Sequence, residues 1–541
     1  MLHLLLRHKM RTSWINKYSN FICILLLLQQ VFSNKIINGL EEEEEEVKRS
    51  EFPNGFLFGT STSAYQIEGA YKEDGKGLSN WDVFSHTNGA IPNGESGDIA
   101  DDHYHRYMED IDIMASLGVN SYRFSISWSR ILPRGILGPV NPAGIKFYNN
   151  IINYLLLKGI TPFASIHHYD YPQEFEDRFG AWLSPLMQEE FVHFAEICFK
   201  SFGDRVKYWA TINEPNLYME TAYLKGGFPP LHCSPPFGKC SSGNSDTEPL
   251  LAIHNSILAH AKAVKLYRHQ FQREQGGMIG IVAGANMYKP MTNDEVDIKA
   301  ANRALAFHVA WLLDPPVYGD YPKEMQKYHG KELPRFSSEE KLLIKNSTDY
   351  IGINHYTTWF AKDCIHSNCT CMNSDAQCTH GENRAISGFV LITGQKDGEY
   401  IGDEMGMSGF YVVPQGMGEI VDYVKKRYNN MPIFVTENGY GSNENEGGGY
   451  DMEQDKKRIK YHKAYLASLA RSIRNGADVR GYFVWSLMDN FEWRLGYSVK
   501  FGLYHVDPLS LNRSPKLSAH WFRDFLSNTS LINNIQAKSS I

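Results

Sequence analysis

Eight strand-like runs alternate with helical stretches along this chain of 541 residues. Apolar residues spaced three and four apart predict helices over 142–158, 185–202, 250–273 and 455–474. The alternation predicts one (β/α)8 TIM barrel with extended βα loops, a fold in which a helix follows each parallel strand. A doubly wound sheet is the alternative, but no Gly-rich phosphate loop follows the first run. The runs are F-L-F-G-T-S-T-S-A, N-S-Y-R-F-S-I-S-W, I-T-P-F-A-S-I-H-H, Y-W-A-T-I-N-E, M-I-G-I-V-A-G-A, Y-I-G-I-N-H-Y, P-I-F-V-T-E-N and V-R-G-Y-F-V-W-S-L.

Two glutamates end strand-like runs, Glu214 on the fourth and Glu437 on the seventh, each next to turn-forming residues. A buried carboxylate is unfavourable unless it is paired, so either one alone could be a structural ion-pair partner. Active sites of barrels lie at the carboxyl ends of the strands. The fourth and seventh strands face each other across the barrel mouth, so both glutamates are predicted to reach one substrate atom.

Other polar and aromatic residues also lie at predicted strand ends. Each alone has a structural interpretation: His168 as a core histidine, Arg123 as an ion-pair partner, Trp485 as ordinary packing. Together they predict a polar cavity with aromatic walls. The set is Gln66, Arg123, Trp128, His168, Asn213, Asn354, Tyr356, Trp485, Glu492 and Trp493.

Two carboxylates that flank one bond suit the hydrolysis of a glycoside. One protonates the leaving oxygen, and the other attacks the anomeric carbon or activates a water. The acid needs a raised pKa, and Asn213 gives Glu214 a neutral neighbour. The other carboxylate must stay ionised, and Arg123 and the Tyr356 hydroxyl are expected to hold Glu437 in that state.

The N-terminal segment has the pattern of a secretory signal peptide, predicted over 1–33. Basic residues precede the apolar run F-I-C-I-L-L-L-L, which is short for a membrane span, although a signal anchor is the alternative. An acidic, disordered linker over 34–50, a barrel domain over 51–527 and a tail over 528–541 are predicted to follow. The net charge of −7 offers no basic surface for nucleic acid or an anionic membrane.

Cysteines and glycosylation sequons agree with passage through an oxidising compartment. Cys233 and Cys240 bracket a short loop and predict a disulfide, and Cys198 is expected to be a buried free thiol. A second cluster predicts further disulfides of open pairing, with a zinc site that also uses His366 and His380 as the alternative. That cluster is Cys364, Cys369, Cys371 and Cys378, and the sequons are at Asn346, Asn368, Asn512 and Asn528.

Several long motifs resemble glycoside hydrolase family 1, in particular its plant β-glucosidases. They are F-L-F-G-T-S-T-S-A-Y-Q-I-E-G, Y-R-F-S-I-S-W-S-R-I-L-P, T-I-N-E-P-N, V-T-E-N-G, W-S-L-M-D-N-F-E-W and F-G-L-Y-H-V-D, and the resemblance extends from about Glu51 to Phe525. It implies a retaining double displacement on a small β-glucoside without metal or cofactor, with Glu214 as acid/base and Glu437 as nucleophile. Arg123 and Tyr356 would tune the nucleophile. The residues implied to hold the sugar are Gln66, His168, Asn213, Trp485, Glu492 and Trp493.

Departures from the family pattern lie mainly on the side of the leaving group, the aglycone. H-Y-D at 168–170 replaces the usual H-W-D and, with the Cys364 cluster, resembles the monolignol glucosidases that act on coniferin. Many relatives have a tryptophan at Gly409 and aromatic residues at Thr221 and Arg494, whereas Phe228 stays aromatic. An open, more polar aglycone pocket is therefore expected, suited to a phenylpropanoid or an oligosaccharide.

Three alternatives to hydrolysis of a phenylpropanoid glucoside follow from the same residues. A transglucosidase would use both carboxylates with another acceptor in place of water, and an oligosaccharide-cleaving β-glucosidase would use the same site. A non-catalytic sugar-binding or structural relative should have lost a carboxylate, but both are present. The secretory pathway leads to the cell wall or the vacuole, and a monomer and a homodimer both fit.

Overall fold

The computed structural model describes residues 46–369, 381–443 and 454–527. The chain divides into two units, Met1–Val47 and Lys48–Ile541, and the second holds every helix and strand named below. Eight parallel strands of this unit form a closed barrel, which confirms the predicted (β/α)8 fold. The barrel strands are β1 (Leu57–Ser61), β2 (Ser121–Ser125), β3 (Thr161–His167), β4 (Tyr208–Asn213), β5 (Met278–Gly284), β7 (Ile351–Asn354), β14 (Ile433–Asn438) and β16 (Val479–Trp485).

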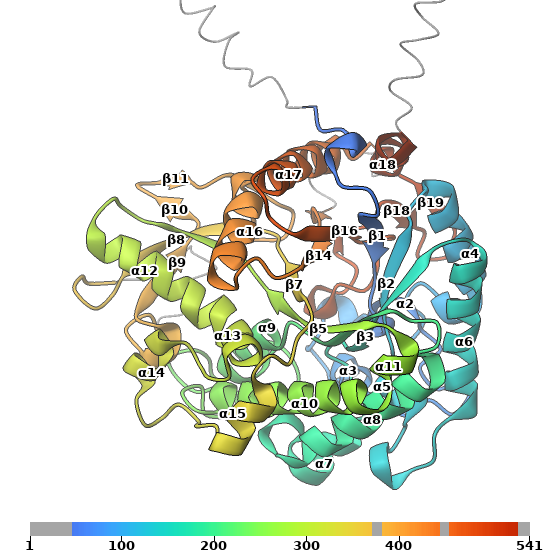
Figure 1. Ribbon diagram of the computed structural model, residues 1–541, viewed down its shortest axis with the longest axis horizontal. Helices are drawn as coiled ribbons and strands as arrows, with labels where there is room; N and C mark the ends of the chain where they lie inside the picture. Colours follow the sequence, from blue (N-terminus) through green and yellow to red (C-terminus); the bar gives the residue numbers. More distant parts are fainter. Residues whose placement is uncertain (1–45, 370–380, 444–453, 528–541) are drawn as a thin grey trace, which may run out of the picture. The chain divides into compact units, whose positions relative to one another are not determined.

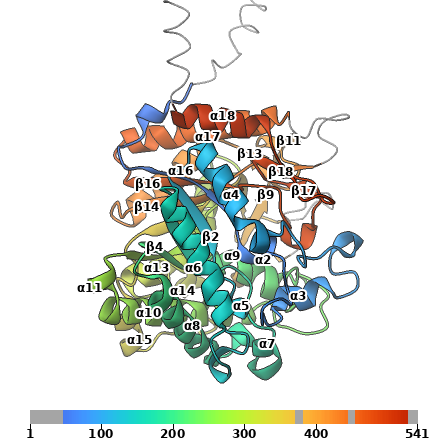
Figure 2. The ribbon, with the colours of Figure 1, turned by 90° about the vertical axis from the view of Figure 1, so that its right-hand side faces the viewer.

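Helices cover the outside of the barrel (Figure 1). Helix α6 packs between α4 and α8, and α8 packs against α10. Helix α16 packs against α17. Figure 2 shows α4 and α6 side by side next to β2. The predicted helices are found within a few residues of their expected ends. The bounds are α4 (His103–Leu117), α6 (Pro142–Leu157), α8 (Leu186–Phe202), α10 (Glu248–Gln270), α16 (Gln415–Arg427) and α17 (Lys456–Arg474).

Aromatic side chains fill the barrel interior below the strand ends. The ring of Phe163 lies 5.3 Å from that of Phe483 and 5.6 Å from that of Phe434. A Cβ on Gly59 would lie 2.4 Å from the Phe483 ring, so this close approach requires glycine. The interior is therefore a packed core, and in such a barrel a functional site is expected above it, at the carboxyl ends of the strands.

The two strands that carry the glutamates are irregular just before them. The pairing of β14 shifts register between Val435 and Glu437 against β7. The pairing of β4 shifts between Ala210 and Asn213 against β5. Such irregularities bend a strand and change the direction of the following side chain.

Disulfides join Cys233 to Cys240, as predicted, and Cys364 to Cys369. Cys198 is free and buried, also as predicted. The second disulfide consumes two of the thiols that the zinc alternative needs, and the described residues hold no cluster of three potential metal ligands. Cys371, Cys378 and His380 lie outside the described residues.

Candidate active site

Glu214 and Glu437 both lie buried at the carboxyl end of the barrel. Glu437 belongs to β14, and the residue is 3% exposed. Glu214 directly follows β4 and precedes α9 (Pro215–Met219), with a left-handed backbone at φ 42°. Its own exposure is 6%. A left-handed conformation is uncommon for a residue other than glycine and concentrates at functional sites.

Glu437 has a cation and a phenol as its partners. Arg123 Nη1 donates a hydrogen bond to Oε1 at 2.6 Å, and the Tyr356 hydroxyl donates to Oε2 at 2.7 Å. Burial raises the pKa of Glu437, and the charge of Arg123 with these hydrogen bonds opposes that rise. The two expected partners of Glu437 are therefore both in contact with it.

Arg123 links Glu437 to the amide of Asn213. Its Nη1 also donates to Ser61 Oγ at 2.9 Å, and its Nη2 donates to Asn213 Oδ1 at 2.6 Å. The same Oδ1 accepts from Asn354 Nδ2 at 3.1 Å, so the Asn213 amide nitrogen faces His168 Nε2, also 3.1 Å away. One hydrogen-bonded network thus joins the ends of the five strands β1, β2, β4, β7 and β14 to His168, which directly follows β3.

His168 presents an unused hydrogen-bond donor. Burial, with the nearby charge of Arg123, lowers the pKa of His168 well below its usual value, so the ring is neutral. With Nε2 accepting from Asn213, the ring proton resides on Nδ1, which has no partner among the described residues. A substrate hydroxyl is a suitable acceptor for this proton.

Within the part of the chain that the structure describes, no cation bonds Glu214 directly. The Tyr169 hydroxyl donates a hydrogen bond to its Oε2. Burial, followed by the charge of Glu437, raises the pKa of Glu214 to about 8. At neutral pH this environment favours a protonated Glu214 beside an ionised Glu437, the asymmetry that an acid and a nucleophile require.

Glu492 adds a third carboxyl group to the site. Gln66 Nε2 lies 3.4 Å from Glu492 Oε2 and also donates to the carbonyl of Phe491 at 2.9 Å. The Ser63 hydroxyl fixes the other end of the Gln66 amide through a 2.6 Å bond to Oε1. Burial, followed by the charge of Glu437, raises the pKa of Glu492 to about 8. Gln66 and Glu492 thus form a polar pair that can bind hydroxyl groups.

Aromatic rings wall the site on the side of His168. Its ring stacks on Trp485 at 5.8 Å and on Trp493 at 5.9 Å. Trp493 also lies 5.0 Å from Tyr169. Trp128, by contrast, begins the short helix α5 (Trp128–Ile131) and is fully buried against α8, so it belongs to the core rather than to the cavity.

Two groups of residues surround the site on the predicted aglycone side. Thr221 and Arg494 approach each other across Gly227, where a Cβ would lie 3.1 Å from Thr221 Cγ2 and 3.6 Å from Arg494 Nη1. The Phe228 ring lies 6.3 Å from that of Trp493. Gly409 accepts a 2.8 Å hydrogen bond from Trp359 Nε1.

Phe410, the residue after Gly409, packs near Tyr356, and Tyr356 bonds Glu437. The rings of Phe410 and Tyr356 lie 6.4 Å apart. The two groups of aglycone residues therefore reach the site from different loops, one through Trp493 and the other through Tyr356.

The sequence predicted no site role for Tyr169, and for Asn354 only a place in the polar cavity, not its partner. Tyr169 directly follows His168 in H-Y-D, and its departure from the usual tryptophan was the available signal. Asn354 was recognised as a strand-end residue, but its contact with Asn213 depends on the neighbouring strands of the closed barrel.

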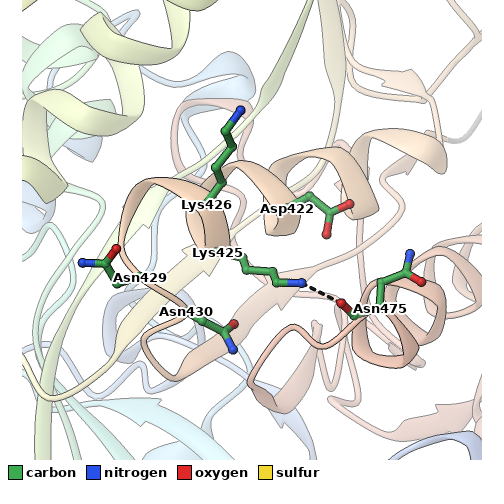
Figure 3. Close-up of a pocket in the computed structure, with 6 residues that line it drawn as sticks. All are labelled: Asp422, Lys425, Lys426, Asn429, Asn430 and Asn475. Atoms are coloured by element: carbon green, nitrogen blue, oxygen red, sulfur yellow. Dashed lines mark hydrogen bonds between the residues drawn. The ribbon is translucent and has the colours of Figure 1, made fainter.

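Figure 3 shows a surface pocket whose residues directly precede the amino-terminal ends of β14 and β16, whereas Glu437 lies near the carboxyl end of β14. The pocket has a volume of about 450 Å³ and lies where α16 and α17 lead into β14 and β16. Lys425 Nζ donates to the carbonyl of Asn475 at 2.6 Å within it. The amino-terminal face of such barrels contributes to stability rather than chemistry. The pocket is lined by Asp422, Lys425, Lys426, Asn429, Asn430 and Asn475.

Arg123→Lys is expected to lower kcat/KM for an aryl glucoside by roughly a hundredfold, because one ammonium group does not replace the guanidinium fork. Arg123 holds down the pKa of Glu437, so a weaker contact raises that pKa and moves the acidic limb of the rate profile to higher pH. Kinetics between pH 4 and 9 measure both effects. Arg427→Lys, at an ion pair with Asp314 on the outer helices, is the control. An unmoved acidic limb would contradict this role.

A (β/α)8 barrel with two buried carboxylates at its mouth, one paired with arginine, defines a glycoside hydrolase. The profile described as "Glycosyl hydrolase family 1" matches residues 48–531. The chain belongs to this family.

Relatives and solved structures of the same family cover most of the chain. The chain is 52% identical to "Probable inactive beta-glucosidase 14" of Oryza sativa subsp. japonica, over 92% of this chain and 94% of that protein. It is 49% identical to "Coniferin beta-glucosidase" of Pinus contorta, over 93% and 97%. The crystal structure of the rice Os3BGlu6 β-glucosidase superposes with a TM-score of 0.83 at 43% identity, over 88% and 99%.

Proposed function

We propose that this protein is a retaining β-glucosidase in which Glu214 is the acid/base and Glu437 the nucleophile. The observation that carries the assignment is the asymmetry of the pair: among the described residues, Glu437 bonds Arg123, whereas the hydrogen bonds to Glu214 come from neutral donors. A mutant of the rice Os3BGlu6 enzyme, 44% identical over 88% of this chain, has been solved in a covalent complex with glucose. That complex supports a covalent intermediate in the family.

In the first step, ionised Glu437 attacks the anomeric carbon and forms a glucosyl ester. The bond to the leaving oxygen breaks, and that oxygen takes the proton of Glu214, so the aglycone departs as a neutral alcohol. In the second step, ionised Glu214 removes a proton from a water that attacks the same carbon. β-Glucose is released, Glu437 regains its negative charge, and Glu214 is protonated again.

The glucose unit is proposed to lie between the polar network and the aromatic wall. The free Nδ1 proton of His168 and the Gln66–Glu492 pair would bind its hydroxyl groups. Trp485 and Trp493 present apolar rings to its carbon–hydrogen face. Asn213 is held in place by Arg123 and Asn354.

For the aglycone, we propose a phenylpropanoid alcohol of the monolignol type. The named activity of the Pinus contorta relative and the H-Y-D sequence at 168–170 support this choice. Phe228 offers one aromatic surface, while Thr221 and the exposed Arg494 leave the rest of the entrance polar. An oligosaccharide and an alcohol acceptor for transglucosylation would use the same entrance.

A substrate comparison separates these possibilities. The purified protein would be given coniferin, syringin and cello-oligosaccharides, and glucose release measured for each, with and without an added alcohol. Preferred turnover of coniferin or syringin is the expected result. Dominant transfer to the alcohol would establish the transglucosidase. No turnover of any glucoside would support a non-catalytic relative, a possibility that the name "Probable inactive beta-glucosidase 14" makes concrete.

Gly409→Trp is expected to change the order of preference among aryl glucosides and to spare the selectivity for glucose. A stacked indole contributes roughly 0.5–1.5 kcal/mol, or up to about tenfold in relative kcat/KM. Gly409 has φ 80°, so any side chain there also strains the backbone. Gly409→Ala carries the same strain without the indole and is the matched control. Equal effects of both variants on every aglycone would contradict the proposed location.

We propose a secretory route for the protein, with glycosylation at the exposed sequons. Asn346, Asn368 and Asn512 are all exposed, whereas Asn528 lies outside the described residues. Both disulfides fit an oxidising compartment. None of the helices in the described ranges is long and apolar enough to span a bilayer. The signal peptide over 1–33 and the linker over 34–50 stay predictions.

A further inference from the structure

Tyr169 is the one tyrosine whose hydroxyl is seen to bond Glu214 among the described residues. The ring is fixed from two sides, because Tyr218 stacks on it at 5.1 Å and Trp493 lies 5.0 Å away. Its carbonyl accepts a hydrogen bond from Asn80 Nδ2 at 3.1 Å. The hydroxyl is thus held against the carboxyl by packing rather than by a flexible contact.

The backbone around this bond has an unusual conformation at three touching residues. Tyr169 has φ 75°, Glu214 has φ 42° and Trp493 has φ 50°, all in the left-handed region. Each such residue costs free energy that the surrounding structure must offset, and such residues gather at active sites. Tyr169 lies in the loop after β3 and Glu214 in the turn after β4, and these two segments bring the phenol into contact with the carboxyl group.

We propose that Tyr169 is a positioning residue for the acid/base step, orienting the Glu214 carboxyl and stabilising its ionised form while the proton moves to the leaving oxygen. The proposal deepens the proposed function and rests on it. Because Oε2 accepts from the phenol, the transferable proton resides on Oε1. As Glu214 loses this proton, the bond becomes charge-assisted and strengthens, so it favours the transition state over the ground state.

Several charged and titratable groups around the site also act on Glu214. The charge of Glu437 raises the pKa of Glu214, whereas the Tyr169 bond lowers it, as do Asn354 and the charge of Arg123. Glu492 and Tyr356 also interact with Glu214 electrostatically. Removal of the phenol alone leaves these groups in place. We therefore expect it to raise the pKa of Glu214.

The test is Tyr169→Phe, which keeps the ring and removes the hydroxyl. At pH 6, where Glu214 is protonated, we expect kcat/KM to fall roughly tenfold or more for phenyl glucoside, a poor leaving group. For 2,4-dinitrophenyl glucoside, whose leaving group needs no proton, the value should change less than about twofold. The alkaline limb of the profile for phenyl glucoside should move to higher pH.

Tyr218→Phe is the matched control. This tyrosine stacks on the same ring but donates its hydroxyl proton to the carbonyl of Pro229 at 2.8 Å. Its leaving-group dependence and alkaline limb should equal those of the wild type. Thermal unfolding of both variants checks that the fold is retained. Equal loss on both substrates by Tyr169→Phe, with an unmoved alkaline limb, would show that Tyr169 only packs and would overturn the proposal.

A second measurement does not depend on turnover. In protein labelled with ¹³C at the glutamate carboxyl carbon, the Glu214 signal is identified by its loss in Glu214→Gln. Its titration midpoint should lie higher in Tyr169→Phe than in the wild type. An equal midpoint overturns the proposal. If the wild type hydrolyses no glucoside, the proposed function fails, while this titration still decides whether Tyr169 controls Glu214.

Discussion

Glu437→Gln is expected to lower kcat for an aryl β-glucoside by roughly 10⁴- to 10⁶-fold, the range seen when a catalytic nucleophile is removed. The amide does not form the glucosyl ester, yet its carbonyl can still accept one hydrogen bond from Arg123 or Tyr356. The fold should therefore persist. Steady-state kinetics and thermal unfolding measure the two effects. Activity within tenfold of the wild type would contradict the assignment.

A matched control for Glu437→Gln is Asp314→Asn. Asp314 is also a carboxylate paired with arginine, and it accepts from Arg427 Nε at 2.8 Å and Nη2 at 2.5 Å. It lies in α13 (Trp311–Tyr318), on the outside of the barrel and away from the carboxylate pair. Its loss should lower stability but leave kcat near the wild-type value. The comparison separates the chemistry at Glu437 from the general effect of breaking a charge pair.

Replacement of each glutamate in turn by glycine distinguishes their roles through the anomeric configuration of the product formed with azide. Glu437→Gly leaves space for azide beside the anomeric carbon, and a single displacement there converts a β-glucoside into α-glucosyl azide. Glu214→Gly keeps Glu437, so an activated substrate forms the ester first, and azide then gives β-glucosyl azide by a second displacement. The reverse pattern of anomers would exchange the two assignments.

The fold and the carboxylate pair were predictable because both depend on local sequence. Each barrel strand is a short run rich in apolar and β-branched residues that alternates with helical stretches, and each glutamate stands where such a run meets a turn former. The parallel barrel then fixes which ends of the strands meet. The pairing of Glu437 with Arg123 followed from the same placement of strand ends, and the structure shows it.

Side-chain direction was not predictable from the same patterns. Trp128 follows β2 closely but begins helix α5, which turns its indole into the core against α8. Tyr169 and Glu214 are 45 residues apart, and their contact depends on two left-handed residues and a register shift. These features arise from packing between distant segments, so no local pattern records them.

Glu214→Gln is expected to affect substrates according to their need for a proton. For phenyl glucoside, kcat/KM should fall by roughly 10²- to 10⁴-fold, because no acid protonates the leaving oxygen. For 2,4-dinitrophenyl glucoside the first step should survive, and the second should become slow because no base activates water. A burst of dinitrophenol equal to the enzyme concentration, followed by slow turnover, is the expected result in a stopped-flow measurement.

The pH dependence of kcat/KM tests which glutamate is the acid and which is the nucleophile. In the wild type, kcat/KM should fall at high pH as Glu214, with its pKa raised to about 8, loses the proton that it donates. It should fall at low pH as Glu437 gains a proton and ceases to be a nucleophile. Glu214→Gln removes the group behind the high-pH fall, so the alkaline limb should disappear while the acidic limb persists. Loss of the acidic limb instead would contradict the assignment of Glu214 as the acid.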